Sequence, residues 1–220
     1  MKPVLVAVVL SLNLACAVAL KAPAPAPTIQ RIEASYGSSV MHFGEYDVKG
    51  VVSNTVGIGV ALGGGRLAMQ QQTVRFAVLR AGRVFTELSC GAGSSEPKLM
   101  MGSFSLNHPK YTVQCSAPDF SLVLSGDPEK PLTGVATWRG VRYPVKTSFD
   151  TAEKGKSPHL GFHIESDDGW LASSDIQGAT WISTAMTPEA REAIVLANFG
   201  WASRRNVIMD GAGSGFMVLR

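Results

Sequence analysis

The chain has 220 residues, of which 45% are hydrophobic, and its formal net charge is +3. This length and composition allow one β-rich domain with a core of its own once an N-terminal segment is set aside. The small net charge gives no basis for nucleic-acid binding, and we expect no nucleic-acid partner.

Residues 1–19 have the layout of a secretory signal. Lys2 precedes an apolar run at 3–12 that Ser11 alone interrupts, and small residues follow. The run is shorter than the roughly 20 residues that a transmembrane helix needs. Ala17 and Ala19 form the A-x-A pattern of a cleavage site, so cleavage after Ala19 is one predicted outcome.

A second processing outcome stays open beside the first. Leu14, Ala15 and Cys16 resemble the end of a bacterial lipoprotein signal, whose cysteine becomes lipidated. In that case the signal ends before Cys16, and the lipid would attach the protein to a membrane. Both outcomes predict an exported protein that is periplasmic, envelope-attached or extracellular.

An Ala/Pro-rich linker follows at 20–28. Alternating alanine and proline favours the extended polyproline II conformation, which makes a semi-rigid spacer. Residues 29–220 are then expected to form a single β-rich domain.

Short runs of β-branched and aromatic residues, separated by turn residues, fill most of this domain. Alternation predicts that Val74, Phe76 and Val78 face one way, and Pro144 indicates an edge or a bulge. Ser/Gly-rich 89–98 is expected to be a loop. The fold class predicted is mainly β, an antiparallel meander closed as a barrel or sandwich. Strands are expected two or three times within 30–52 and then at 55–62, 69–79, 84–88, 99–106, 111–115, 120–124, 133–138, 141–147, 159–165, 170–176, 180–183, 207–209 and 216–219.

One strong helix signal lies at 187–205. Thr187 can cap the first free amides, and Pro188 suits the first helical position. Apolar residues point in all directions from 193 to 202, with Asn198 as the clear polar exception, so we expect a buried helix over about 188–203. Gly200 either ends this helix early or allows close packing.

The helix also carries a resemblance to a known fold. The letters AIVLANF at 193–199, in a domain of comparable size, are similar to the C-terminal helix of the tubby-like fold. The resemblance implies a many-stranded barrel around a hydrophobic helix, in a family that binds phosphoinositides or acts in membrane-associated regulation. It assigns no site residue here. The strands expected after the helix depart from the family pattern, in which the helix comes last or nearly so.

Cys90 and Cys115 are the cysteines that follow the signal region. In an exported chain an isolated pair most simply forms a disulfide, and no C-x-x-C motif indicates redox chemistry.

A metal site is one candidate for function. His159, His163, Glu165 and Asp167 would lie in one row of a strand, because alternate residues share a face. Imidazole and carboxylate ligands suit zinc, with His159, His163 and Glu165 as the candidate ligand set. The alternative is the solvated face of an antiparallel sheet, with no cofactor.

A basic sheet face is a second candidate. Arg142 and Lys146 would share one face of a strand, with Arg139 at the adjoining turn. If the hairpin that carries Arg75, Arg80 and Arg83 were adjacent, these side chains would form a patch for anionic lipid headgroups or acidic glycan. Charge that keeps the outer face soluble is the alternative.

These patterns favour an envelope-associated, non-catalytic binding or interaction module with a protein, glycan or lipid ligand. Two alternatives remain. One is a hydrolase or metal-dependent enzyme that uses the 159–167 strand. The other is a domain that binds anionic membrane surfaces through its basic sheet face.

Overall fold

The computed structural model describes residues 29–36, 41–63, 65–94, 96–101, 104–107, 109–127, 130–150, 156–175 and 179–211. The expected signal segment, Cys16, the linker at 20–28 and the expected strand at 216–219 lie outside these ranges.

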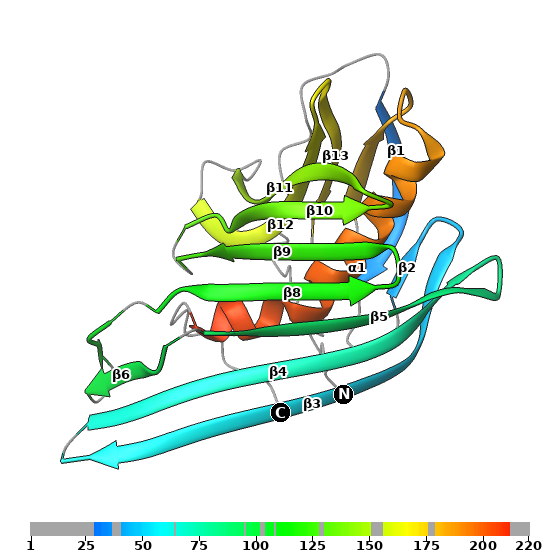
Figure 1. Ribbon diagram of the computed structural model, residues 1–220. Coiled ribbons are helices and arrows are strands. Elements are labelled where there is room, and N and C mark those ends of the chain that lie inside the picture. Colours follow the sequence, from blue (N-terminus) through cyan, green and yellow to red (C-terminus); the bar gives the residue numbers. More distant parts are fainter. Residues whose placement is uncertain are drawn as a thin grey trace, which may run out of the picture.

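The described chain folds into antiparallel strands followed by one helix, which confirms the prediction of a mainly β meander (Figure 1). The elements are β1 (Ile29–Tyr36), β2 (Met41–Phe43), β3 (Tyr46–Leu62), β4 (Gly65–Arg80), β5 (Arg83–Ser94), β6 (Lys98–Met101), β7 (Phe104–Ser105), β8 (Tyr111–Ala117), β9 (Phe120–Gly126), β10 (Thr133–Trp138), β11 (Val141–Asp150), β12 (Lys156–Ser166), β13 (Gly169–Asp175), β14 (Ala179–Ser183) and α1 (Pro188–Gly211).

The strand pairings lead around the molecule and back to their starting point. From β1 they pass through β2, β3, β4, β5 and β8, then in chain order to β14, which pairs with β1. β6 and β7 form a side branch at the start of β4. The meander therefore wraps around as an irregular, barrel-like enclosure, which at β2 is joined by a strand of only three residues.

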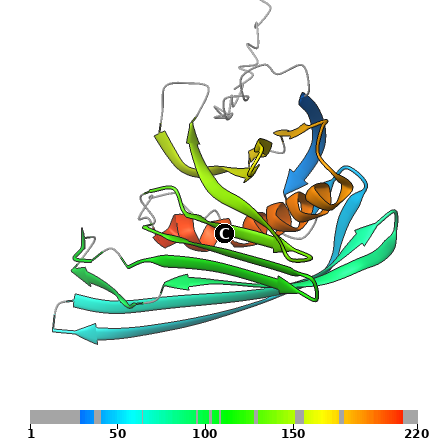
Figure 2. The ribbon, with the colours of Figure 1, turned by 45° about the horizontal axis from the view of Figure 1, so that its top comes forward.

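Helix α1 lies inside this enclosure (Figure 2). It contacts β1, β4, β5, β8, β9, β10, β12 and β13, and the side chains from Ala193 to Ala197 have no exposed surface. The predicted cap is present, because the amide of Ala190 donates to Thr187 Oγ1 at 3.2 Å. The side-chain Nδ2 of Asn198 donates to the carbonyl of Ile194 at 2.9 Å, so this buried side chain has a hydrogen-bond partner within the helix itself.

The helix is longer than predicted. It continues to Gly211, beyond the expected end near 203, and takes up the predicted strand at 207–209. A short apolar run such as 207–209 fits a strand or a helix equally well, and no glycine or proline stands between Gly200 and Gly211.

Two of the predicted boundaries are wrong because the segments contain several glycines. The expected strand at 55–62 is the second part of β3, which runs without a break from Tyr46. The expected loop at 89–98 is strand β5 as far as Ser94. There Cys90 and Ala92 face the core and alternate with Gly91 and Gly93, so strand periodicity is present but carried partly by residues without side chains. The expected strand at 99–106 is divided into β6 and β7.

The hairpin predictions are confirmed at their turns. Ala81 and Arg139 each have a φ of +48° and are followed by Gly82 and Gly140, also at positive φ. Such turns match the twist of the strands they join. Pro144 lies opposite Val135 of β10, while pairing with β12 starts at the next residue, so its missing N–H costs no ladder bond on that side.

The predicted disulfide is present in the core. Cys90 and Cys115 stand directly opposite each other on β5 and β8, with Cα atoms 4.0 Å apart. Val74, Phe76 and Val78 are buried on the same inner face, as predicted. Gly200 lies within the helix against this disulfide, so close packing, and not termination, explains the glycine.

Candidate functional site

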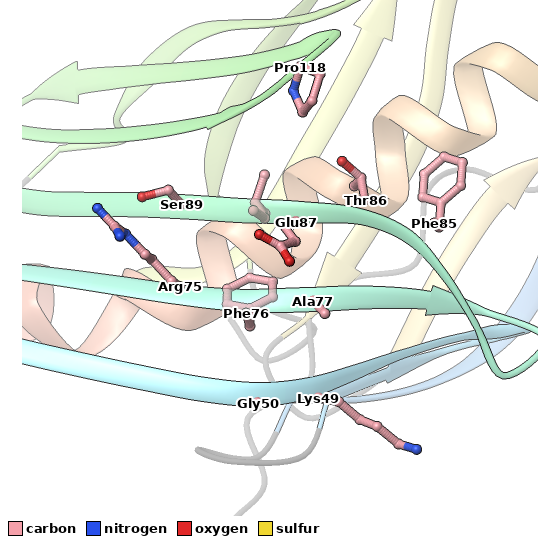
Figure 3. A pocket seen from close by; sticks show the side chains of 11 residues that line it. Lys49, Gly50, Arg75, Phe76, Ala77, Phe85, Thr86, Glu87, Ser89 and Pro118 are labelled. Carbon is pink, nitrogen blue, oxygen red and sulfur yellow. The ribbon is translucent and has the colours of Figure 1, made fainter.

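A hollow of about 790 Å³ opens on the outer face of the sheet (Figure 3). It lies across β3, β4 and β5 and reaches the turn between β8 and β9. The strands bend there because the β3–β4 register shifts between Lys49 and Val52, and the β4–β5 register shifts between Val78 and Leu79. The lining residues are Lys49, Gly50, Arg75, Phe76, Ala77, Phe85, Thr86, Glu87, Leu88, Ser89 and Pro118.

The hollow combines opposite charges with hydroxyl and apolar groups. Arg75 of β4 is paired with Ser89 of β5. Glu87 lies two residues before Ser89 on β5 and therefore faces the same side. Figure 3 shows Arg75, Glu87 and Ser89 over the strands, whereas Lys49 extends away from them. The exposed ring of Pro118 supplies apolar surface at one border. This is a surface with polar groups for orientation and apolar groups for contact.

A second hollow of about 260 Å³ continues along the same strands. Its floor is Gly91 and Gly93 of β5, whose missing side chains leave a furrow between β4 and β8. We call the outer-facing row of β5 from Glu87 to Gly93, with its neighbours on β4 and β8, the β5 furrow. Its polar walls are Gln71 and Thr73 on β4 and Thr112 and Gln114 on β8.

In the sheet, β8 and β9 separate the β4–β5 hairpin from the β10–β11 hairpin, so Arg75 does not lie beside Arg142 and Lys146. From Arg75 the register runs across Ser89, Ser116, Ser121 and Thr137 before it reaches Arg142. Five strand spacings separate the two arginines by about 24 Å. Arg142 and Lys146 are exposed on β11, as expected for their face.

Arginines of the two hairpins do meet at one end of the enclosure, around Glu192 of α1. Arg80 Nη1 lies 3.3 Å from Glu192 Oε1, and Arg139 Nη1 lies 3.9 Å from Oε2. The indole Nε1 of Trp138 donates to the same Oε2 at 3.2 Å. Arg80 also contacts Glu45 Oε1 at 3.1 Å. One nearly buried carboxylate thus joins the helix to two hairpin turns.

Aromatic rings support this cluster. The guanidinium carbon of Arg80 lies 5.5 Å from the ring centre of Tyr46, and that of Arg139 lies 4.9 Å from Trp138. Burial raises the pKa of Tyr46, and the hydrogen bond to Glu45 raises the pKa of Arg80. Sequence reasoning missed the cluster because Arg80 and Glu192 are 112 residues apart.

Of the residues expected to form a metal-binding row, His159, His163 and Glu165 lie on β12. His163 Nδ1 lies 2.6 Å from Ser173 Oγ, which also accepts a hydrogen bond from Trp170 Nε1 at 2.8 Å. Glu165 is exposed opposite Trp170, beyond a register shift. Only the backbone of His159 is described.

Within the described ranges no three His, Cys, Asp or Glu side chains are placed to hold a metal ion. The zinc site therefore stays a prediction. Ser173 is fully buried, so its hydroxyl and His163 do not form an accessible nucleophile and base.

Among the helices of the described residues, none is long and apolar enough to span a membrane. No protein family, curated protein or solved structure matches this chain.

Proposed function

We propose that this chain is an exported, envelope-associated binding module without catalytic activity, and that it holds a glycan along the β5 furrow. The observation that carries the proposal is the hollow of about 790 Å³, with the glycine-floored hollow of about 260 Å³ next to it along β4 and β5. A groove of this form accepts an extended chain better than a compact ligand.

The chemistry of the furrow supports a glycan. The amides of Gln71 and Gln114 and the hydroxyls of Thr73 and Thr112 can each donate and accept hydrogen bonds. Sugar hydroxyls need both. The apolar ring of Pro118 can cover the aliphatic face of a sugar, and Arg75 can pair with an acidic substituent.

The arrangement of the acid–base groups favours binding over catalysis. Glu192 is engaged by Arg80, Arg139 and Trp138, and His163 is engaged by the buried Ser173. Both clusters use their polar groups to hold the fold together. The furrow itself lies on paired strands, which keep its side chains in fixed positions suited to recognition.

The proposal is tested by a substitution that fills the β5 furrow with a side chain. At Gly91 a Cβ would have its nearest neighbours at 3.9 and 4.0 Å, so Gly91→Leu should fold and place its side chain in the furrow. Ser121→Leu is the matched control, because Ser121 is exposed on β9 outside both hollows. The probes are peptidoglycan sacculi in co-sedimentation and soluble neutral oligosaccharides in calorimetry.

We expect the unchanged protein and Ser121→Leu to bind equally, and Gly91→Leu to bind at least about tenfold more weakly. Absence of binding to both probes would contradict the glycan ligand. Equal binding by Gly91→Leu would show that the furrow is not the site. Circular dichroism of all three proteins checks that each is folded.

Envelope attachment is proposed from the signal segment and from the disulfide, which forms in oxidising compartments. Replacement of Cys16 by serine decides the mode of attachment. Loss of the protein from the membrane fraction would support lipidation, and an unchanged distribution would support cleavage after Ala19.

A further inference from the structure

One edge of β3 is uncovered in the described structure. On the side away from β4, β3 pairs with β2 at Tyr46 and Asp47 only. From Val48 to Leu62 no described strand pairs with this edge, although pairing with β4 continues to Leu62. Figure 1 shows β3 as the outermost strand of a long hairpin.

This edge lacks the features that usually prevent strands from adding to it. From Val51 to Leu62 the sequence contains no charged residue and no proline. Val52, Val56 and Val60 are 68%, 56% and 48% exposed. Edge strands are normally protected by charges, proline or bulges, because their free N–H and C=O groups can pair with another strand. Here Lys49 and the bulge lie only at the base of the exposed segment.

We propose that the β3 edge pairs antiparallel with the β3 edge of a second copy of this chain, about a twofold axis at Val56. The valines of the edge are placed symmetrically about this residue, and between them Asn54 lies opposite Ile58 of the second copy. Val52 and Val60 stand four residues on either side of Val56. Val52 of one copy therefore lies opposite Val60 of the second copy, and Val56 lies opposite Val56. On the alternate face Thr55 lies opposite Gly57, and Ser53 lies opposite Gly59.

This symmetry distinguishes a second copy from a strand of another protein. A twofold interface uses the same segment on both chains, so the segment must be complementary to itself. Valine opposite valine is a favourable cross-strand pair, and small residues opposite Thr55 and Ser53 leave room for their side chains. No like charges would face each other. The inference does not depend on the glycan proposal.

A charge at the axis tests the pairing. Val56→Lys places two lysines directly opposite each other, which opposes pairing. Val123→Lys is the control, since Val123 is exposed on β9 between two paired neighbours. Sedimentation velocity should give twice the monomer mass for the unchanged protein and Val123→Lys, and the monomer mass for Val56→Lys.

The register has its own test, made with Cys16 replaced by serine. Val56→Cys should give a disulfide-linked dimer on mild oxidation, because opposite residues at the axis are close enough to join. Asn54→Cys should not, since residue 54 would face residue 58 of the second copy. A protein that stays monomeric up to about 1 mM would overturn the proposal. A dimer unaffected by Val56→Lys, or cross-linked at 54 and not at 56, would overturn it as well.

Discussion

The backbone of Gly200 lies directly against the disulfide: a Cβ at this position would stand 2.7 Å from Cys115 Sγ and 3.3 Å from Leu122 Cδ2. The glycine thus sets how closely α1 approaches β8 and β9. It joins the last described element of the fold to the one covalent cross-link within the described residues.

Gly200→Ala should destabilise the protein, because the new methyl group overpacks the core at a cost of about 1–3 kcal/mol. Alanine returns about 1 kcal/mol in the helix interior, so a net loss of up to about 2 kcal/mol is expected. Urea unfolding measures it. Gly91→Ala is the control, since a Cβ there meets only ordinary contacts. A Gly200→Ala protein as stable as the unchanged one would show that the helix can move away from β8 without cost.

Removal of the disulfide should lower the free energy of unfolding by about 3 kcal/mol, since the bridge closes a loop between residues 25 apart. The measurement is urea unfolding of the Cys90→Ala/Cys115→Ala protein. In that background Gly200→Ala should cost less than in the unchanged protein, because the sulfur nearest the new methyl group is gone. Additive effects in this cycle would contradict the proposed clash.

Glu192→Gln should cost about 1–3 kcal/mol, because the change leaves Arg80 and Arg139 without their shared carboxylate. Both arginines are about half exposed, which keeps the cost below that of a fully buried pair. Thermal unfolding of Glu192→Gln and of Glu189→Gln compares this position with an exposed acid of the same helix. Equal stability of the two variants would show that the cluster does not hold the helix.

Stability should fall as pH rises above about 10, the ordinary pKa of tyrosine. Burial raises the pKa of Tyr46 and Tyr143 in the folded protein, with the Glu189 carboxylate adding to the effect at Tyr143. The unfolded chain therefore releases these protons first, so the contribution is complete below pH 10 and is lost as pH rises through the folded pKa values.

Urea unfolding at pH 8 to 11 measures how the free energy of unfolding changes with pH. Tyr46→Phe/Tyr143→Phe should show a smaller loss of stability across this range than the unchanged protein. An identical slope for both would mean that other groups cause the alkaline loss.

Local signals in the sequence predicted the hairpins and the start of the helix. Turn residues such as Arg139 and Gly140 mark a hairpin without reference to the rest of the chain, and Thr187 marks a cap in the same way. The inner face of β4 followed from simple alternation. The disulfide followed from the count of cysteines and the expected compartment.

Relationships between distant segments were beyond such signals. The enclosure depends on β1 pairing with β14, where Ile29 stands opposite Ser183. The Glu192 cluster and the β5 furrow likewise bring together residues from separate hairpins. Gly91 and Gly93 lie in a segment that the sequence predicts to be a loop. They alternate with the buried Cys90 as in a strand, and they form the floor of the furrow.

The position of α1 in the chain has a consequence for biosynthesis. Every strand of the enclosure is synthesised before the helix that fills it, and the apolar lining of those strands has no partner until Pro188 and the residues after it have emerged. Folding must therefore finish after translation of nearly the whole described chain. This order of elements suits the proposed export, because the enclosure cannot be completed before the helix is made, and a chain interrupted before the helix would expose its interior to proteases and chaperones.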